Sequence, residues 1–138
     1  MRILGLDVGT KRIGVAMSDE LLLTTQGRDS IERRNLKSDL DQIYSTIKAN
    51  DVSEVVVGLP LNMDGTYSAK TKEVIEFLDS LTEIVNVPVK TWDERLTSVQ
   101  AERTLLEADL SRAKRKRLSD KLAAQIILQS YLDSQRKG

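Results

Sequence analysis

Residues 3–16 read ILGLDVGTKRIGVA, and this stretch decides the fold. An apolar run carries a single carboxylate, Asp7, into a short turn with Gly and Thr, and a second apolar run follows at once. The pattern predicts a β-hairpin whose first strand is mostly buried, with its one ionised group near the end of that strand. A buried carboxylate needs a partner. Because the chain has no histidine and no cysteine, a metal ion, alone or with a bound phosphate, is the candidate partner of Asp7.

The composition narrows both the class of protein and its chemistry. The chain has 138 residues, which suits a single domain over residues 1–138, and its 21 Lys and Arg balance 21 Asp and Glu. Without cysteine and histidine there are no disulfides, thiol nucleophiles, catalytic triads or common zinc sites. No apolar run approaches the roughly 20 residues of a membrane span, and the N-terminus has no signal-peptide pattern. We therefore expect a cytoplasmic protein with no membrane partner, which uses carboxylates, lysines, hydroxyls and bound cations.

The hydrophobic pattern along the chain predicts a mixed sheet with helices on its faces. Strands are expected over residues 2–8, 12–18, 21–26, 54–58 and 88–92, and helices over 35–49, around 74–81, over 97–107 and over 119–134. This order of elements is typical of an α/β domain with a five-stranded mixed sheet flanked by helices.

Carboxylates from three distant parts of the chain are expected to meet at one edge of this sheet. Asp7 ends the first strand and Glu94 follows the last strand. Groups at the carboxyl ends of parallel strands gather at the edge where α/β folds bind ligands. Asp120 opens the last helix and shares the face of Ala124 and Ile127, which is expected to point inward. Clustered carboxylates without histidine suit Mg²⁺ or Mn²⁺, and these ions usually serve phosphate chemistry.

Each of these acidic residues also has a purely structural explanation. Asp7 is compatible with a turn in which it bonds its own backbone, although its place in an apolar run favours a functional role. Either Asp93 or Glu94 is able to pair with Arg95 or to cap the helix that follows, and the sequence does not choose between them. Asp120 taken alone is better explained as a first-turn residue that the helix dipole favours. The argument for a site depends on the carboxylates as a group.

Basic residues close to these carboxylates suggest a partner that carries phosphates. The segment 112–117 leads directly into Asp120, and its basic residues are Arg112, Lys114, Arg115, Lys116 and Arg117. Lys11 and Arg12, in the predicted hairpin turn, add to the same positive field beside Asp7. A nucleic-acid backbone bound at the proposed metal edge accounts for these charges. A solvated interhelical loop is the alternative explanation of the basic run.

The loop over residues 59–66 follows a predicted strand end. It offers Asn62, Gly65 and Thr66 as candidate contacts to phosphate or sugar. A tight strand-to-helix connection, in which Pro and Gly serve only the geometry, explains the loop equally well. Aromatic residues make up 4% of the chain, which argues against a platform that stacks single-stranded bases. Tyr67 and Trp92 are the aromatic residues near the edge, and Trp92 fits the core better.

Four motifs in order resemble the YqgF/RuvX family of the RNase H-like superfamily. They are DVGTKRIGVA at 7–16, VVGLPLNMDG at 56–65, DERLT at 93–97, and an aspartate before an apolar helix, DKLAAQIIL, at 120–128. The resemblance covers nearly the whole chain and implies an RNase H-like fold. It also implies a metal-dependent nuclease in which Asp7, Glu94 and Asp120 are the catalytic carboxylates that bind Mg²⁺ or Mn²⁺. Superfamily enzymes commonly use four acidic residues, for which Asp93 and Asp64 are the candidates here.

The same resemblance implies a substrate and a reaction. Family members are assigned to trimming the 5′ end of pre-16S ribosomal RNA and were earlier proposed to resolve Holliday junctions. Precursor rRNA and branched DNA are therefore the expected nucleic-acid partners, with ribosomal particles as a further candidate. A metal-activated water would attack the phosphodiester in line and leave a 3′-hydroxyl and a 5′-phosphate.

Three other functions are compared with this one. A junction resolvase would use the same carboxylates but needs a dimer, and the sequence leaves monomer and homodimer open. A non-catalytic RNA-binding or ribosome-binding factor would need the basic run and not the carboxylates. An actin-like ATPase or sugar kinase also begins with Asp-x-Gly-Thr, but it needs a second such domain, which this chain lacks.

Overall fold

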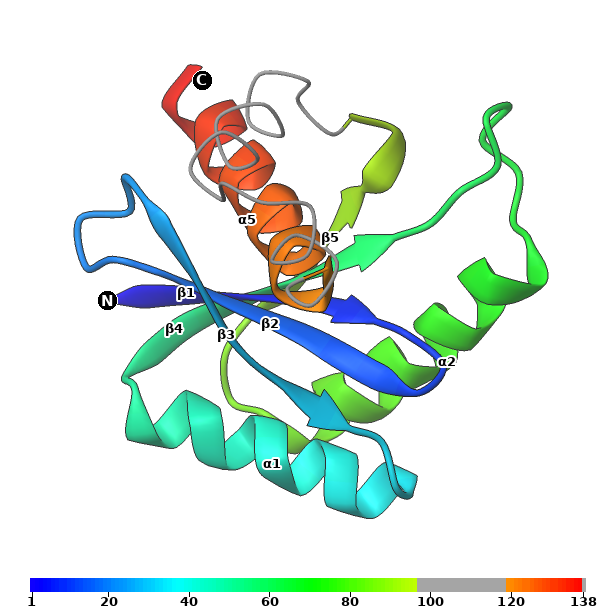
Figure 1. Ribbon diagram of the computed structural model, residues 1–138, viewed down its shortest axis with the longest axis horizontal. Coiled ribbons are helices and arrows are strands. Elements are labelled where there is room, and N and C mark those ends of the chain that lie inside the picture. Colours follow the sequence, from blue (N-terminus) through cyan, green and yellow to red (C-terminus); the bar gives the residue numbers. More distant parts are fainter. Residues whose placement is uncertain (97–118, 138) are drawn as a thin grey trace.

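A five-stranded mixed sheet lies at the centre of the computed structural model, which describes residues 1–96 and 119–137 (Figure 1). The strands are β1 (Arg2–Val8), β2 (Arg12–Ser18), β3 (Thr25–Glu32), β4 (Val52–Leu59) and β5 (Val89–Asp93). Their order across the sheet is β3-β2-β1-β4-β5. β1, β4 and β5 run parallel, whereas β2 is antiparallel to both β1 and β3. The predicted mixed sheet is confirmed.

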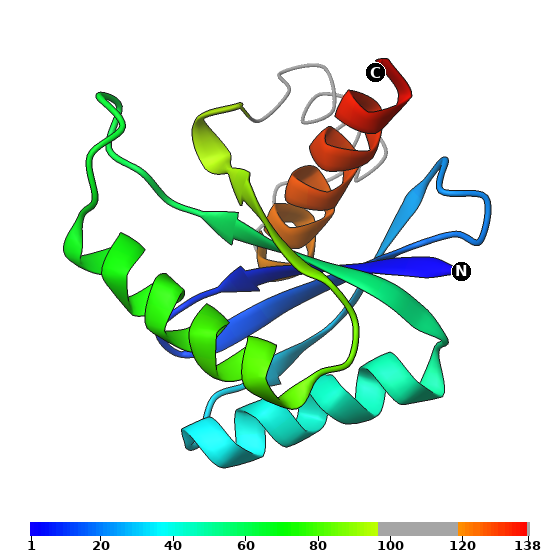
Figure 2. The same ribbon diagram turned by 180° about the vertical axis from the view of Figure 1, so that it is seen from behind.

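Helices cover both faces of the sheet. α1 (Leu36–Ala49) and α2 (Ala69–Ile84) pack on one face, and α5 (Ser119–Lys137) crosses the other (Figures 1 and 2). Asn35 caps α1 by accepting a hydrogen bond from the Ser38 backbone, and Ser68 forms a capping box with Thr71 at the start of α2. The helix predicted over 97–107 and the basic run at 112–117 lie outside the described residues. Within residues 1–96 and 119–137, no helix is long and apolar enough to cross a membrane.

Alternation along the strands divides the core into two layers. Leu4, Leu6, Val55 and Val57 are fully buried on the face of α1 and α2. The layer beneath α5 contains Ile3, Ala16, Val56, Ala124, Ile127 and Leu128. Because successive side chains of a strand point to opposite faces, every second residue of β1 and β4 lies beneath α5. At the ends of the strands, the same alternation decides which polar side chains lie on the face covered by α5 and which lie on the opposite face.

The third strand was predicted at the wrong place. Residues 21–26 were expected to form it, but β3 spans Thr25–Glu32 and the apolar residues before it form a turn. Oδ1 of Asp19 accepts hydrogen bonds from the backbone N–H groups of Leu23 and Thr24, at 2.7 and 2.9 Å. Leu22 adopts a positive φ of 60° within this turn. The side chain of Asp19 thus stabilises a turn where hydrophobicity alone predicted a strand.

Candidate active site

Asp7 lies at the carboxyl end of β1, on the face that α5 covers. It shares this face with Ile3 and Gly5, and a Cβ built on Gly5 would lie 2.8 Å from Cβ of Leu128 in α5. Gly5 therefore allows the helix to approach the sheet closely, one strand step before the carboxylate. Asp7 is half-buried, so it is less enclosed than the apolar run predicted.

Glu94 reaches the same face from the end of β5. Trp92 pairs with Gly58 of β4 and packs in the layer beneath α5, where its ring meets Tyr131 edge-on at 6.2 Å between centroids. Trp92 is half-buried and packs against the core layer beneath α5, close to the predicted core position. Glu94 follows two residues later and begins the short 3₁₀ helix η1 (Glu94–Leu96). Its Cδ atom lies 3.3 Å from the position that a Cβ on Gly58 would occupy.

The surroundings of Glu94 favour its neutral form. The pKa of Glu94 is raised from 4.5 to about 7, mainly by burial, then by the negative charge of Asp7 and to a smaller extent by that of Asp93. The positive charge of Lys70, in the first turn of α2, acts in the opposite direction. Asp7 and Glu94 are therefore close enough to repel each other, which is the relationship expected of two ligands of one cation.

Asp93 is bound by Arg95, and of the two neighbours Glu94 is the one that lies on the face of α5. The Arg95 guanidinium binds both carboxylate oxygens of Asp93, with its shortest contact at 2.7 Å. This contact lowers the pKa of the Asp93 carboxyl. Asp93 pairs with Leu59, and the preceding residue, Trp92, pairs with Gly58 and lies beneath α5. Alternation therefore turns Asp93 away from the α5 face and directs Glu94 toward it.

Asp120 lies in the first turn of α5, as predicted. Ala124, one turn later, places its carbonyl oxygen 3.4 Å from the position of a Cβ on Gly5, which brings the start of the helix to the Asp7 end of β1. Ala124, Ile127 and Tyr131 are buried, so the predicted inward face of the helix is confirmed. The side chain of Asp120 lies outside the described set, and its role as third ligand stays a prediction.

The fourth acidic ligand is not found among the described side chains, where no group of three acidic residues is placed to hold a metal. Asp93 is bound by Arg95. Asp64 accepts hydrogen bonds from the backbone and the hydroxyl of Thr66, at 3.0 and 2.6 Å. Neither candidate completes a cluster with Asp7 and Glu94.

The predicted nucleic-acid contacts fall into three groups. Lys11 lies in the turn between β1 and β2, beyond Asp7, and Arg12 begins β2. Both are exposed, and Arg12 Nε donates to Glu32 at 2.8 Å. Asn62 lies in the loop between β4 and α2 and donates its side-chain amide to Thr66 Oγ1 at 3.0 Å, so this amide holds the loop together. The remaining candidates lie outside the described residues; they are Arg112, Lys114, Arg115, Lys116 and Arg117.

Two cationic residues near the site escaped the sequence argument. Lys70 follows the VVGLPLNMDG motif and acts on Glu94 only because the loop returns the chain to the end of β4. Arg33 donates to the carbonyl oxygen of Gly9 at 2.9 Å and to Asp39 at 3.2 Å, and thereby fixes the β1–β2 turn against α1. The position of Lys70 soon after the motif at 56–65 was the one sequence feature that could have pointed to it. Nothing in the sequence indicated the role of Arg33, because one of its partners is a backbone carbonyl 24 residues away and the other is an ordinary aspartate.

Comparison with known sequences gives full-length matches. A family model described as "RuvX: Holliday junction resolvase" matches residues 1–134. A relative from Halothermothrix orenii is 50% identical over 137 residues, covering 99% of this chain and 98% of the relative. A relative from Syntrophomonas wolfei is 51% identical over 138 residues, covering 100% of this chain and 98% of the relative. Both bear the name "Putative pre-16S rRNA nuclease".

Solved structures share the fold at low sequence identity. T. thermophilus RuvC in complex with a Holliday junction substrate matches with a TM-score of 0.70 and 14% identity, covering 99% of this chain and 96% of that chain. The fowlpox virus resolvase with Holliday junction DNA matches with a TM-score of 0.55 and 15% identity, covering 98% and 99%. At such identities the likeness concerns the fold alone. The chain has the RNase H-like fold, which confirms the predicted fold class.

Proposed function

The chain belongs to the RuvX family, and on this basis we propose that it is a metal-dependent nuclease that hydrolyses phosphodiester bonds at the 5′ end of precursor 16S rRNA. The observation that carries the proposal is the placement of Asp7 and Glu94 on one face of the sheet, at the carboxyl ends of β1 and β5. The names of the relatives supply the RNA substrate. Such a substrate places the activity in the cytoplasm, with ribosomal particles as the candidate partner.

The residues at this edge fit a hard divalent cation. Both donors are carboxylates, the set has no nitrogen or sulfur ligand, and the two negative charges repel each other. A cation between them would remove this repulsion and favour the ionised form of Glu94. We propose Asp7, Glu94 and Asp120 as the ligands and Mg²⁺ or Mn²⁺ as the ion. When bound, such an ion polarises the phosphoryl group and activates water for attack.

The other side chains of the edge would hold the substrate. Lys70, whose charge acts on Glu94, is suited to bind an anionic oxygen of the phosphate. Lys11 and Arg12 extend from the turn beyond Asp7 and would contact the nucleic-acid backbone. The basic run 112–117 would add further phosphate contacts before α5 begins. None of these contacts reads base sequence, so the proposed site positions a strand and cleaves it.

The test is cleavage of a precursor 16S 5′-leader RNA with Mg²⁺ or Mn²⁺. Asp7→Asn is nearly isosteric and is expected to fold normally and to lose cleavage. Asp41→Asn, at an exposed position of α1, is the matched control and is expected to cleave as the wild type does. Wild-type protein that binds the RNA but never cleaves it with either ion would overturn the nuclease and favour a binding factor.

A Holliday junction resolvase is the second candidate, because the matching family model bears that description. It would use the same carboxylates on branched DNA and would act as a homodimer, whereas the rRNA nuclease has no need of two sites. A four-way DNA junction assayed beside the leader RNA separates the two functions. Preferential cleavage of the junction by a dimer would favour the resolvase.

A further inference from the structure

Large apolar side chains lie exposed next to the proposed site. Met63 is 88% exposed and Tyr67 56%, and both belong to the loop between β4 and α2. Leu96, two residues after Glu94, is 61% exposed. Exposed apolar side chains close to a proposed site are candidate contacts for its ligand. None of these side chains has a role in the site described above.

The loop that carries Met63 and Tyr67 is held in one conformation by its own hydrogen bonds. Leu61 and Tyr67 form an antiparallel bridge across its base. Asn62 N–H donates to the Thr66 carbonyl at 2.9 Å, and Gly65 N–H donates to the Asn62 carbonyl at 2.8 Å. Gly65 has a φ of 87°, which glycine adopts without strain. Side chains on such a loop are presented to a ligand with little loss of conformational freedom.

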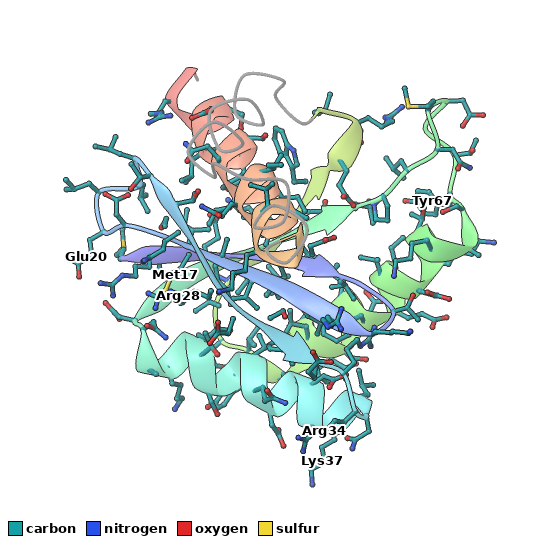
Figure 3. All side chains as sticks on the ribbon, viewed as in Figure 1. Met17, Glu20, Arg28, Arg34, Lys37 and Tyr67 are labelled. Atoms are coloured by element: carbon teal, nitrogen blue, oxygen red, sulfur yellow. The ribbon has the colours of Figure 1, made fainter. Side chains whose placement is uncertain are left out.

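Arg95 fixes this loop relative to Glu94. Its Nη1 atom donates to the Met63 carbonyl at 3.1 Å, while its other nitrogens bind Asp93. Because Arg95 directly follows Glu94 in the chain, its contact with Met63 holds the loop close to the Glu94 backbone. Figure 3 shows Tyr67 beside the start of α2, the helix whose first turn contains Lys70. The exposed ring therefore lies on the same edge of the molecule as the proposed phosphate site.

We propose that Tyr67 stacks on one unpaired base of the substrate strand next to the phosphate that is cleaved. The proposal rests on the proposed nuclease function and specifies its substrate as a strand with an unpaired nucleotide at the site. Every base has a π-face that an exposed aromatic ring can meet, and such stacking tolerates any sequence. A single ring serves a single base, which agrees with the low aromatic content of the chain.

Binding measurements without divalent ions test the stacking, because the RNA then stays intact. The probes are a single-stranded RNA oligonucleotide and the same sequence in a duplex, with affinity measured by fluorescence anisotropy. Tyr67→Ala is expected to bind the single strand about tenfold more weakly or worse, the range that stacking of one base supports. Tyr67→Phe keeps the ring and is expected to bind within about twofold of the wild type, as is Tyr67→Ala on the duplex. Leu21→Ala removes an apolar side chain that is 75% exposed at the opposite end of the sheet and is the control.

A second readout reports the ring contact directly. An oligonucleotide with 2-aminopurine at successive positions is expected to lose fluorescence at one position with wild type and Tyr67→Phe, and not with Tyr67→Ala. Equal binding of the single strand by Tyr67→Ala and wild type overturns the stacking, and so does an equal loss on strand and duplex. Cleavage by the wild type is scored separately. Protein that quenches through Tyr67 but never cleaves refutes the nuclease and leaves the stacking standing, whereas equal cleavage and binding by Tyr67→Ala refutes the stacking alone.

Discussion

Glu94 packs directly against Gly58, the residue of β4 that pairs with Trp92. The Glu94 Cδ atom lies 3.3 Å from the position that a Cβ on Gly58 would occupy, and Cδ1 of Ile127 lies 2.5 Å from that position. A side chain at residue 58 would push both the carboxylate and α5 away from the sheet. The absence of a side chain at Gly58 is thus what allows Glu94 to lie beneath the helix and beside Asp7.

Gly58→Ala is expected to lower cleavage by more than its loss of stability explains. Overpacking against Ile127 should cost about 1–3 kcal/mol of unfolding free energy. Gly27→Ala is the matched control, because its Cβ would also meet α5, at 2.9 Å from Cβ of Lys121, without a contact to Glu94. Denaturant unfolding and kcat/KM are measured for both variants. Equal activity of the two at equal stability would contradict the role of Gly58 in placing Glu94.

The pKa of Glu94 predicts how stability depends on pH in metal-free protein. Since burial and the negative charge of Asp7 raise this pKa from 4.5 to about 7, the folded protein binds the proton more tightly than the unfolded chain. The resulting stability is fully present below pH 4.5 and is lost as pH rises through about 7. We expect a loss of about 1–2 kcal/mol, because solvent screens a carboxylate that is only partly buried.

Glu94→Gln is expected to remove this pH dependence. Urea unfolding in EDTA at pH 5 and pH 8 measures it, with Glu76→Gln, at an exposed position of α2, as the control. The wild type and the control should lose stability between the two pH values by the same amount. An undiminished loss in Glu94→Gln would show that another group titrates.

Divalent ions are expected to stabilise the wild type at pH 8. An ion that binds only the folded protein adds about 1.4 kcal/mol at ten times its dissociation constant. Asp7→Asn and Glu94→Gln each remove one proposed ligand and should show a much smaller shift of Tm with Mg²⁺ or Mn²⁺. Asp41→Asn serves again as the control. Shifts of equal size in all four proteins would place the ion elsewhere.

The site was partly predictable because its residues lie at strand ends that hydrophobic runs reveal. Asp7 at the end of an apolar run and Glu94 after β5 are placed by the alternation of their strands. The choice between Asp93 and Glu94 required the register of Trp92 against Gly58, which one sequence does not contain. Lys70 was missed because its charge reaches Glu94 across a loop, through space.

The error at the third strand has a local cause. The run Leu21–Leu23 is apolar, but hydrogen bonds to Asp19 close it into a turn. β3 itself is an edge strand whose residues are mostly exposed or half-buried, so hydrophobicity gave little sign of it. Where β3 approaches α5 most closely, the residue is Gly27, which has no side chain to contribute to a pattern, and the neighbouring contacts are polar ones from Thr25 and Asp29.

Asp39 is expected to stabilise the turn beyond Asp7. It is 1% exposed, and it accepts hydrogen bonds from Arg33 Nε at 3.2 Å and from the Arg34 backbone at 3.1 Å. Asp39→Ala should cost about 2–4 kcal/mol of stability, since it leaves partly buried donors without their acceptor. Asp41→Ala, two residues later on the exposed side of α1, should cost less than about 0.5 kcal/mol. A small effect of Asp39→Ala in thermal unfolding would show that water replaces the carboxylate.

The basic run 112–117 is expected to supply phosphate contacts, a prediction that rests on the sequence alone. Replacing Arg115 and Lys116 with Ala should weaken RNA binding and reduce the slope of log affinity against log salt by about one unit for each lost contact. Replacing Lys48 and Lys72, which are exposed on α1 and α2, removes the same charge elsewhere and is the control. Affinity is measured by anisotropy from low to moderate salt. If both double variants weaken binding equally, the run acts only through net charge, and if neither does, it has no part in the site.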